Sequence, residues 1–197
     1  TIPKGHEAQF EEYLKQVQNT GVAKNVRVFW STCFQTIDFT INWFDPASET
    51  WTFPWDKWIE EIPSHGTNLP TTLRDPKDFP IEGDEVDVFI LKELEKDSTV
   101  SLTKIADMLG VSQQLVGYHY RQHLLGRGLI SSFEVSVFHF GRTTSDAFYF
   151  IFKFDSTDKL AKFALSLMDK PFAKGLGKIL GENSLLGYLY LPKPEFR

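Results

Sequence analysis

The stretch LGVSQQLVGYHYRQHLLGRGLI, residues 109–130, has the apolar spacing of a helix but carries polar side chains that a buried helix does not need. Gly110 stands where a tight turn needs a permissive backbone, and Ser112 is a suitable N-cap for the helix that follows. We expect one side of this helix to be buried through Leu115, Val116, Tyr120 and Leu124. We expect the opposite side to present Gln113, Gln114, Gly117, Tyr118 and Arg121.

The residues before this stretch complete a helix-turn-helix pattern. Residues 84–97 predict a first helix with an acidic first turn, and Ser101 can cap a second, shorter helix over 101–110. Residues 127–140 then change from helical to strand periodicity, which is typical of a wing. Together these segments predict a winged helix-turn-helix domain over residues 82–140.

The polar face has side chains suited to reading bases. Glutamine forms paired hydrogen bonds with adenine and arginine with guanine, and a helix fits the major groove. Gly117 would allow close approach to a backbone or to a base edge. Hydroxyl and basic side chains near the turn would hold the phosphates, namely Ser101, Thr103, Lys104, Ser112 and Arg127. We therefore interpret the domain as a sequence-specific binder of double-stranded DNA.

The charge balance limits how this domain could bind DNA. The chain has a net charge of −5, which argues against indiscriminate binding of polyanions. Most acidic residues of the domain lie in 82–97, whereas residues 98–132 hold three basic residues and one acidic residue. Because each chain could neutralise only a few phosphates, specific affinity would require a dimer.

The residues on either side of this domain predict mixed α and β structure. Residues 1–62 read as an amphipathic helix at 6–18, then strands at 25–31 and 34–44 and an aromatic hairpin.

Beyond that, residues 63–81 contain several breakers and no periodicity, so we expect a linker. Residues 141–197 predict a strand, a helix and two further strands around the turn Gly181-Glu182-Asn183.

The segment DVFILKELEKDSTVSLTKIADMLGVSQQLVGYHYRQHLLGRGLI, residues 87–130, resembles the DNA-binding half of the Lrp/AsnC family of transcriptional regulators, most strongly over 101–116. The residues after it resemble that family's second half, a ferredoxin-like βαββαβ module that dimerises and often binds a small effector. The resemblance implies an α+β fold in which a central winged helix-turn-helix is flanked by ferredoxin-like half-modules. It also implies a homodimer or higher homo-oligomer, with a small-molecule effector near Gly181 and Asn183.

Residues 141–197 resemble only the first half of that module, its βαββ part. The N-terminal residues could supply the missing helix and strand. The tail LPKPEF (191–196) and the beginning IPKGHEAQF (2–10) both contain Pro-Lys. The chain could be a piece of a longer parent with two such units, or its ends could complete one sheet within a chain or across a dimer. The alternative is a chance match between unrelated segments.

No residue set indicates catalysis or a cofactor. His119 and His123 have a metal-competent spacing, but the sequence offers them no third ligand, so we expect core or phosphate-facing histidines and no metal site. Residues 174–181, KGLGKILG, lack the spacing of a phosphate-binding loop. Cys33 is the only cysteine, and no Ser/His/Asp set stands out, so we expect no enzyme. Hairpin packing, rather than an aromatic ligand box, is the expected use of Trp43, Trp51, Trp55 and Trp58.

The sequence therefore predicts a dimeric transcriptional regulator without a cofactor. The single cysteine fits a reducing compartment, and we expect a cytoplasmic location. No apolar run approaches the length of a membrane span, so we expect no membrane partner. Two alternatives remain open: a winged-helix module that binds proteins, and a small-molecule sensor without DNA binding.

Overall fold

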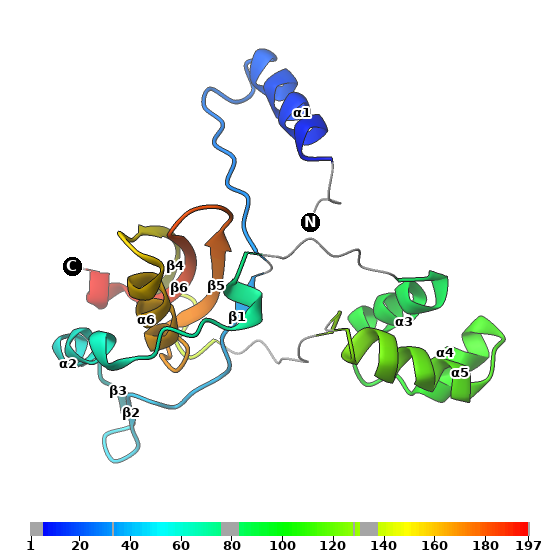
Figure 1. Cartoon of the computed structure of the whole chain (residues 1–197). Coiled ribbons are helices and arrows are strands. Elements are labelled where there is room, and N and C mark those ends of the chain that lie inside the picture. The colour runs from blue at the N-terminus through cyan, green and yellow to red at the C-terminus, as the bar shows by residue number, and fades with distance from the viewer. Residues whose placement is uncertain (1–5, 33, 76–82, 128, 131–137, 197) are drawn as a thin grey trace. The chain divides into compact units, whose positions relative to one another are not determined.

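The computed structural model describes residues 6–32, 34–75, 83–127, 129–130 and 138–196. The chain forms two compact units: residues 1–76 with 138–197, here called the sheet unit, and residues 77–137, here called the helical unit (Figure 1). The described residues are mixed α and β, with six α-helices and a four-stranded antiparallel sheet. None of their helices combines the length and the apolar character needed to cross a membrane.

The sheet unit is built on four antiparallel strands in the spatial order β1-β5-β6-β4. Their bounds are β1 Gln35–Thr36, β4 Ser145–Lys153, β5 Ala173–Ile179 and β6 Ser184–Pro192. Strands β4 and β5 both run antiparallel to β6, so the chain between them must cross over. Helix α6, Thr157–Leu167, makes this crossover. The strand–helix–strand–strand order expected for residues 141–197 is therefore present.

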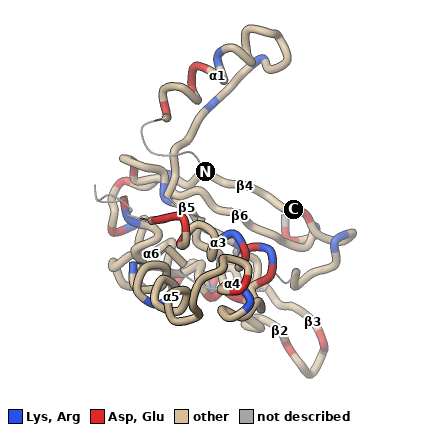
Figure 2. The backbone as a smooth tube through the Cα atoms, turned by 90° about the vertical axis from the view of Figure 1, so that its right-hand side faces the viewer, with Lys and Arg blue, Asp and Glu red and all other residues tan. Residues whose placement is uncertain are grey.

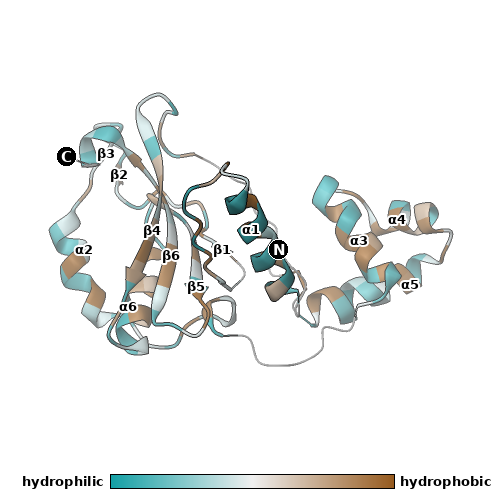
Figure 3. Cartoon of the chain, turned by 90° about the horizontal axis from the view of Figure 1, so that it is seen from above, coloured by the Kyte–Doolittle hydropathy of each residue, from teal (hydrophilic) through white to brown (hydrophobic). Residues whose placement is uncertain are grey.

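Helix α6 covers one face of the sheet and forms the core of this unit (Figure 3). Ser156 caps its first turn by accepting a hydrogen bond from the Lys159 amide at 3.3 Å. The buried side of the helix packs with residues from β5 and β6 in one apolar cluster that includes Leu160, Leu167, Leu176 and Leu185. On β4, Phe150 and Phe152 pack against this cluster, while the alternate residues Tyr149 and Ile151 are exposed. This alternation is the period-two pattern of a strand with one covered face.

Three of the tryptophans pack around Phe172, a buried residue directly before β5. The ring centroids of Trp43, Trp55 and Trp58 lie 5.4, 5.0 and 5.4 Å from that of Phe172. They come from a short hairpin and the helix after it: β2 Phe44–Asp45, β3 Thr50–Trp51 and α2 Trp55–Glu61. These contacts agree with hairpin packing as the use of the tryptophans.

The long strand expected over residues 34–44 is interrupted. Only β1 and the first residue of β2 are extended and paired, because the chain turns between them and Trp43 adopts a φ of 74°. A positive φ takes the backbone out of the β region, so the alternating apolar pattern cannot continue as one strand.

The expected linker also requires correction. Residues 63–75 pack on the sheet unit through two short 3₁₀ turns, η1 Ile62–Ser64 and η2 Thr71–Leu73. Leu73 is completely buried and Leu69 nearly so, both in the same apolar cluster as α6. Two isolated leucines at irregular spacing give no periodic signal, which is why the sequence predicted a linker here. The remaining residues of the expected linker, 76–81, lie outside the described part of the chain.

The N-terminal segment runs along the outer edge of β5. After helix α1, Glu7–Asn19, the predicted strand over residues 25–31 makes only one β-bridge, from Ser31 to Ile179. The Leu180 amide donates to the Trp30 carbonyl at 2.8 Å, and β1 continues the pairing with β5. Within one chain, the N-terminal segment thus extends the sheet at β5 and not at β4.

The described residues of the helical unit form three α-helices around a small apolar core. They are α3 Glu85–Lys96, α4 Leu102–Leu109 and α5 Gln113–Tyr118, and η3 His119–Leu125 continues α5 with π-helical hydrogen bonding. Ile90, Ile105, Val116 and Leu124 are fully buried in this core. The wing expected over residues 127–140 falls largely on residues 131–137, which lie outside the described part of the chain.

Candidate functional site

The turn between α4 and α5 is fixed by local hydrogen bonds. The Ser101 hydroxyl accepts from the Lys104 amide at 3.2 Å and begins α4, and the Ser112 hydroxyl accepts from the Leu115 amide at 3.2 Å and begins α5. Gly110 ends α4 with a φ of 68°, in the left-handed region that favours glycine. These three residues set the angle at which α5 leaves the turn.

The residues expected to read bases lie together on the outside of this turn. Gln113, Gln114, Tyr118 and Arg121 are exposed, and 53% of the Tyr118 surface is accessible. Gly117 differs from the expectation because it is buried, and what covers it is the Arg121 side chain. A Cβ atom at residue 117 would lie 3.3 Å from the Arg121 Nη1 atom. The guanidinium group therefore rests along the helix over Gly117.

Leu115 is another difference from the expected faces, because 40% of its surface is exposed. Val116 is at the centre of the buried side, and successive helical residues are about 100° apart, so Leu115 is turned toward the edge of the exposed face. Apolar side chains in this position can contact the methyl group of thymine.

The residues expected to contact phosphates are also exposed and close to the turn in sequence. They are Ser101, Thr103, Lys104, Ser112 and Arg127. The capping hydroxyls of the two serines accept from backbone amides, which leaves each hydroxyl hydrogen available as a donor.

The charges of the helical unit are unevenly distributed (Figure 2). Helix α5 has no charged residue, whereas α3 carries acids in its first turn and again toward its end. Helix α5 is therefore free of carboxylates that would repel an anion such as a phosphate group.

Next to Tyr118, His119 and His123 meet two aspartates at the start of α3, its N-cap residue Asp84 and Asp87 in its first turn. The His119 Nδ1 atom lies 2.9 Å from Asp87 Oδ1, and the His123 Nδ1 atom lies 3.0 Å from Asp87 Oδ2. Asp84 and Asp87 cap α3 reciprocally, each accepting a hydrogen bond from the other's backbone amide. Sequence reasoning missed these aspartates because they precede His119 by more than thirty residues.

The pKa of Asp87 is below its usual range despite burial. Burial raises this pKa, but the hydrogen bond from the Asp84 amide and those with the two histidine rings lower it by more. The carboxylate form is therefore the one that this cluster holds.

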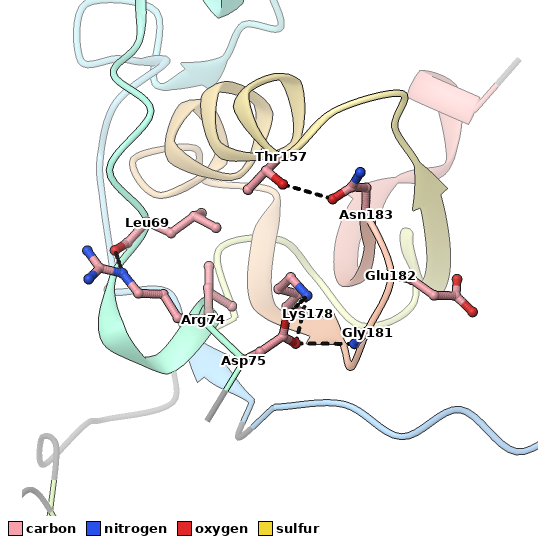
Figure 4. Close-up of a pocket in the computed structure, with 9 residues that line it drawn as sticks. Leu69, Arg74, Asp75, Thr157, Lys178, Gly181, Glu182 and Asn183 are labelled. Carbon is pink, nitrogen blue, oxygen red and sulfur yellow. Dashed lines mark hydrogen bonds and ion pairs between the residues drawn. The ribbon is translucent and has the colours of Figure 1, made fainter. Parts of the chain in front are cut away.

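In the sheet unit, the residues expected to contact an effector line a pocket of about 230 Å³ (Figure 4). Gly181 and Asn183 lie in the turn between β5 and β6, and Asn183 accepts a hydrogen bond from the Thr157 hydroxyl at 3.0 Å. This volume suits a ligand smaller than most drug-sized molecules.

Two further pocket residues, Asp75 and Lys178, were not predicted from the sequence. The Asp75 carboxylate accepts from the buried Lys178 ammonium group at 2.7 and 2.8 Å and from the Gly181 amide at 3.3 Å. A ligand carboxylate could use the same two donors only by displacing Asp75. Asp75 could not be recognised from the sequence as a pocket residue, because it falls in a segment without periodicity.

Comparisons with known proteins give little guidance. No family model matches the chain, and no curated protein matches it. A solved crystal structure of a protein named PH0061 aligns with 57% of this chain and 74% of its own, at 21% identity and a TM-score of 0.45. Both values are too low to carry an argument about function.

Proposed function

We propose that this protein is a sequence-specific DNA-binding transcriptional regulator in which α5 enters the major groove. The observation that carries the proposal is the exposed set Gln113, Gln114, Tyr118 and Arg121 on the capped helix formed by α5 and η3, whose other side buries Val116 and Leu124. These side chains contribute little to the core of the helical unit. Their donors and acceptors match those of adenine and guanine in the major groove.

The architecture we propose is Lrp/AsnC-like. The helical unit would be a winged helix-turn-helix, and β4, α6, β5 and β6 would be the first half of a ferredoxin-like module. The sheet unit would join two copies in the cytoplasm. A dimer would double the number of phosphate contacts, which an acidic chain needs for specific binding.

The experiment begins with selection of binding sites from random duplexes, followed by titration of the selected site by fluorescence anisotropy. Arg121→Ala should weaken binding to the selected site by about 1–3 kcal/mol and relax the preference at one base position. The matched control is Arg27→Ala, which removes an exposed arginine from the sheet unit. An unchanged base preference in Arg121→Ala would show that the helix formed by α5 and η3 does not read bases.

Salt dependence separates this function from a protein-binding module. Each lost phosphate contact lowers the slope of log affinity against log salt by about 0.9. Lys104→Ala should therefore reduce the slope for all sequences alike, without changing base preference. A protein-interaction module would show no salt-dependent retention of DNA.

The pocket favours a second candidate function, that of a small-molecule sensor. Lys178 and the Gly181 amide already bind one carboxylate, that of Asp75, and a small carboxylic acid that displaces Asp75 would find the same two donors. A screen of small carboxylic acids by thermal unfolding would detect such a ligand, since binding to the folded state raises the unfolding temperature. A ligand that stabilises a chain without DNA affinity would favour the sensor over the regulator.

A further inference from the structure

Four potential metal ligands converge where the N-terminus of α3 meets η3. They are Asp84, Asp87, His119 and His123, and one ligand atom from each lies within 4.8 Å of all the others. None of them belongs to the proposed reading face or to the pocket of the sheet unit.

The distances within the cluster resemble those around a four-coordinate metal ion. The Nδ1 atom of His119 lies 2.9 Å from Asp87 Oδ1 and 3.5 Å from Asp84 Oδ1. The Nδ1 atom of His123 lies 3.0 Å from Asp87 Oδ2. Bonds of about 2.0–2.1 Å in tetrahedral geometry place ligand atoms about 3.3 Å apart. The ligand atoms that are furthest apart, within 4.8 Å of each other, would therefore need only small side-chain movements to reach this spacing.

Two members of the cluster are buried, so it is not an ordinary group of surface charges. The Asp87 side chain is 2% exposed and that of His119 is 9% exposed, so both are removed from water. Buried charges in proteins are paired or coordinate metals. Asp84, with a side chain 52% exposed, gives an ion access to the cluster from solvent.

The backbone gives an independent indication. The helix changes from α to π hydrogen bonding at His119 and keeps it through Leu125, so the altered segment contains both histidines. Such π segments are rare and are frequently found at functional sites. Here the segment holds the two rings with centroids 4.5 Å apart and both Nδ1 atoms directed at one carboxylate.

We propose that Asp84, Asp87, His119 and His123 bind one divalent transition-metal ion, with Zn²⁺ the best match. Imidazole nitrogen together with carboxylate oxygen suits zinc and its neighbours in the first transition series. Magnesium and calcium are disfavoured because they prefer oxygen ligands throughout. The ion would join the start of α3 to η3. The centroid of the Tyr118 ring lies 5.8 Å from that of His119 and 5.3 Å from that of His123, so the cluster also contacts Tyr118.

The test is metal binding by the full chain after removal of metal with a chelator. Zinc chloride is titrated in a calorimeter, and the bound metal is counted by elemental analysis after desalting. We expect one zinc ion per chain in the wild type. Zinc should also raise the unfolding temperature, because the ion binds the folded cluster.

Two conservative variants test the assigned ligands. Asp84→Asn keeps a good N-cap but removes one charged ligand, and His123→Gln keeps a donor for Asp87 but removes an imidazole. His65→Gln, outside the cluster, is the matched control. Zinc binding that is at least tenfold weaker in both variants, and unchanged in the control, supports the site.

Failure of the wild type to take up zinc would overturn the proposal, as would equal binding by the variants and the control. Either result would leave a hydrogen-bonded structural network in its place. The outcome is independent of DNA binding, so failure here and failure of the proposed regulator function are distinguishable.

Discussion

At the scale of single residues, Lys174 and His139 form a titratable pair inside the sheet unit. The Nε2–H group of His139 donates to the Thr40 carbonyl at 2.7 Å, so its Nδ1 atom accepts from the Lys174 ammonium group. Burial lowers the pKa of Lys174 to about 8. Burial and the positive charge of Lys174 lower the pKa of His139 below 6.5, although its hydrogen bond to Thr40 acts in the opposite direction.

This pair predicts how the stability of the sheet unit depends on pH. The pKa of Lys174 rises from about 8 in the folded state to 10.5 in the unfolded state, so over this interval the unfolded state binds more protons. Stability therefore increases with pH, as the cost of burying the ammonium group disappears. Between pH of about 7.5 and about 9.5, the wild type should gain stability relative to Lys174→Met, measured by urea unfolding. Parallel pH profiles of the two proteins would contradict the assignment.

At the scale of elements, locally determined features were predictable from the sequence. Ser101 and Ser112 occupy the capping positions that we expected, and Gly110 has the positive φ that its turn requires. Each feature depends on residues three or four apart, so a short stretch of sequence contains the whole signal.

Features that depend on distant contacts were not predictable in this way. Leu73 enters the core of the sheet unit, and Asp87 reaches the two histidines, only through tertiary packing. The one-sided burial of α5 was largely predicted, but Leu115 lies at its boundary, where a rotation of one residue decides exposure. The base-reading roles and the effector site remain predictions.

Ser112 allows capping to be separated from phosphate contact. Ser112→Ala removes the acceptor for the Leu115 amide and should destabilise the helical unit by about 0.5–2 kcal/mol. Ser112→Asp keeps a good cap, so stability should remain near the wild-type value, but its negative charge should weaken DNA binding. Chemical unfolding and anisotropy titration of both variants measure the two effects. Unchanged DNA binding in Ser112→Asp would place residue 112 away from the phosphates.

At the scale of the whole molecule, the sheet unit offers an exposed apolar strip for the proposed dimer. Tyr149 is 70% exposed and stacks on Tyr188, with ring centroids 4.8 Å apart, and Ile151 is exposed beside Leu186. Exposed apolar groups of this kind commonly mark association surfaces.

Tyr149→Lys tests this surface by placing a charge in it. We expect the wild type to have the mass of two chains in light scattering and the variant to have the mass of one. DNA affinity should fall with it, because each chain alone makes few phosphate contacts. Tyr13→Lys, at an exposed tyrosine of α1, is the control. A variant that keeps the wild-type mass would exclude this strip from the interface.

The two outer strands of the sheet also determine how far association can proceed. Ser31 and β1 lie along the outer side of β5, where a Phe34 ring fills the space that a side chain at Gly175 would take. Among the described residues, no strand pairs with the outer side of β4. A sheet with two open sides could add copies indefinitely and form a fibre. At the other edge, β1 is only two residues long, too short to pair with a further copy. Pairing through the nine-residue β4 of both partners would therefore leave no long open edge, and growth would stop at two.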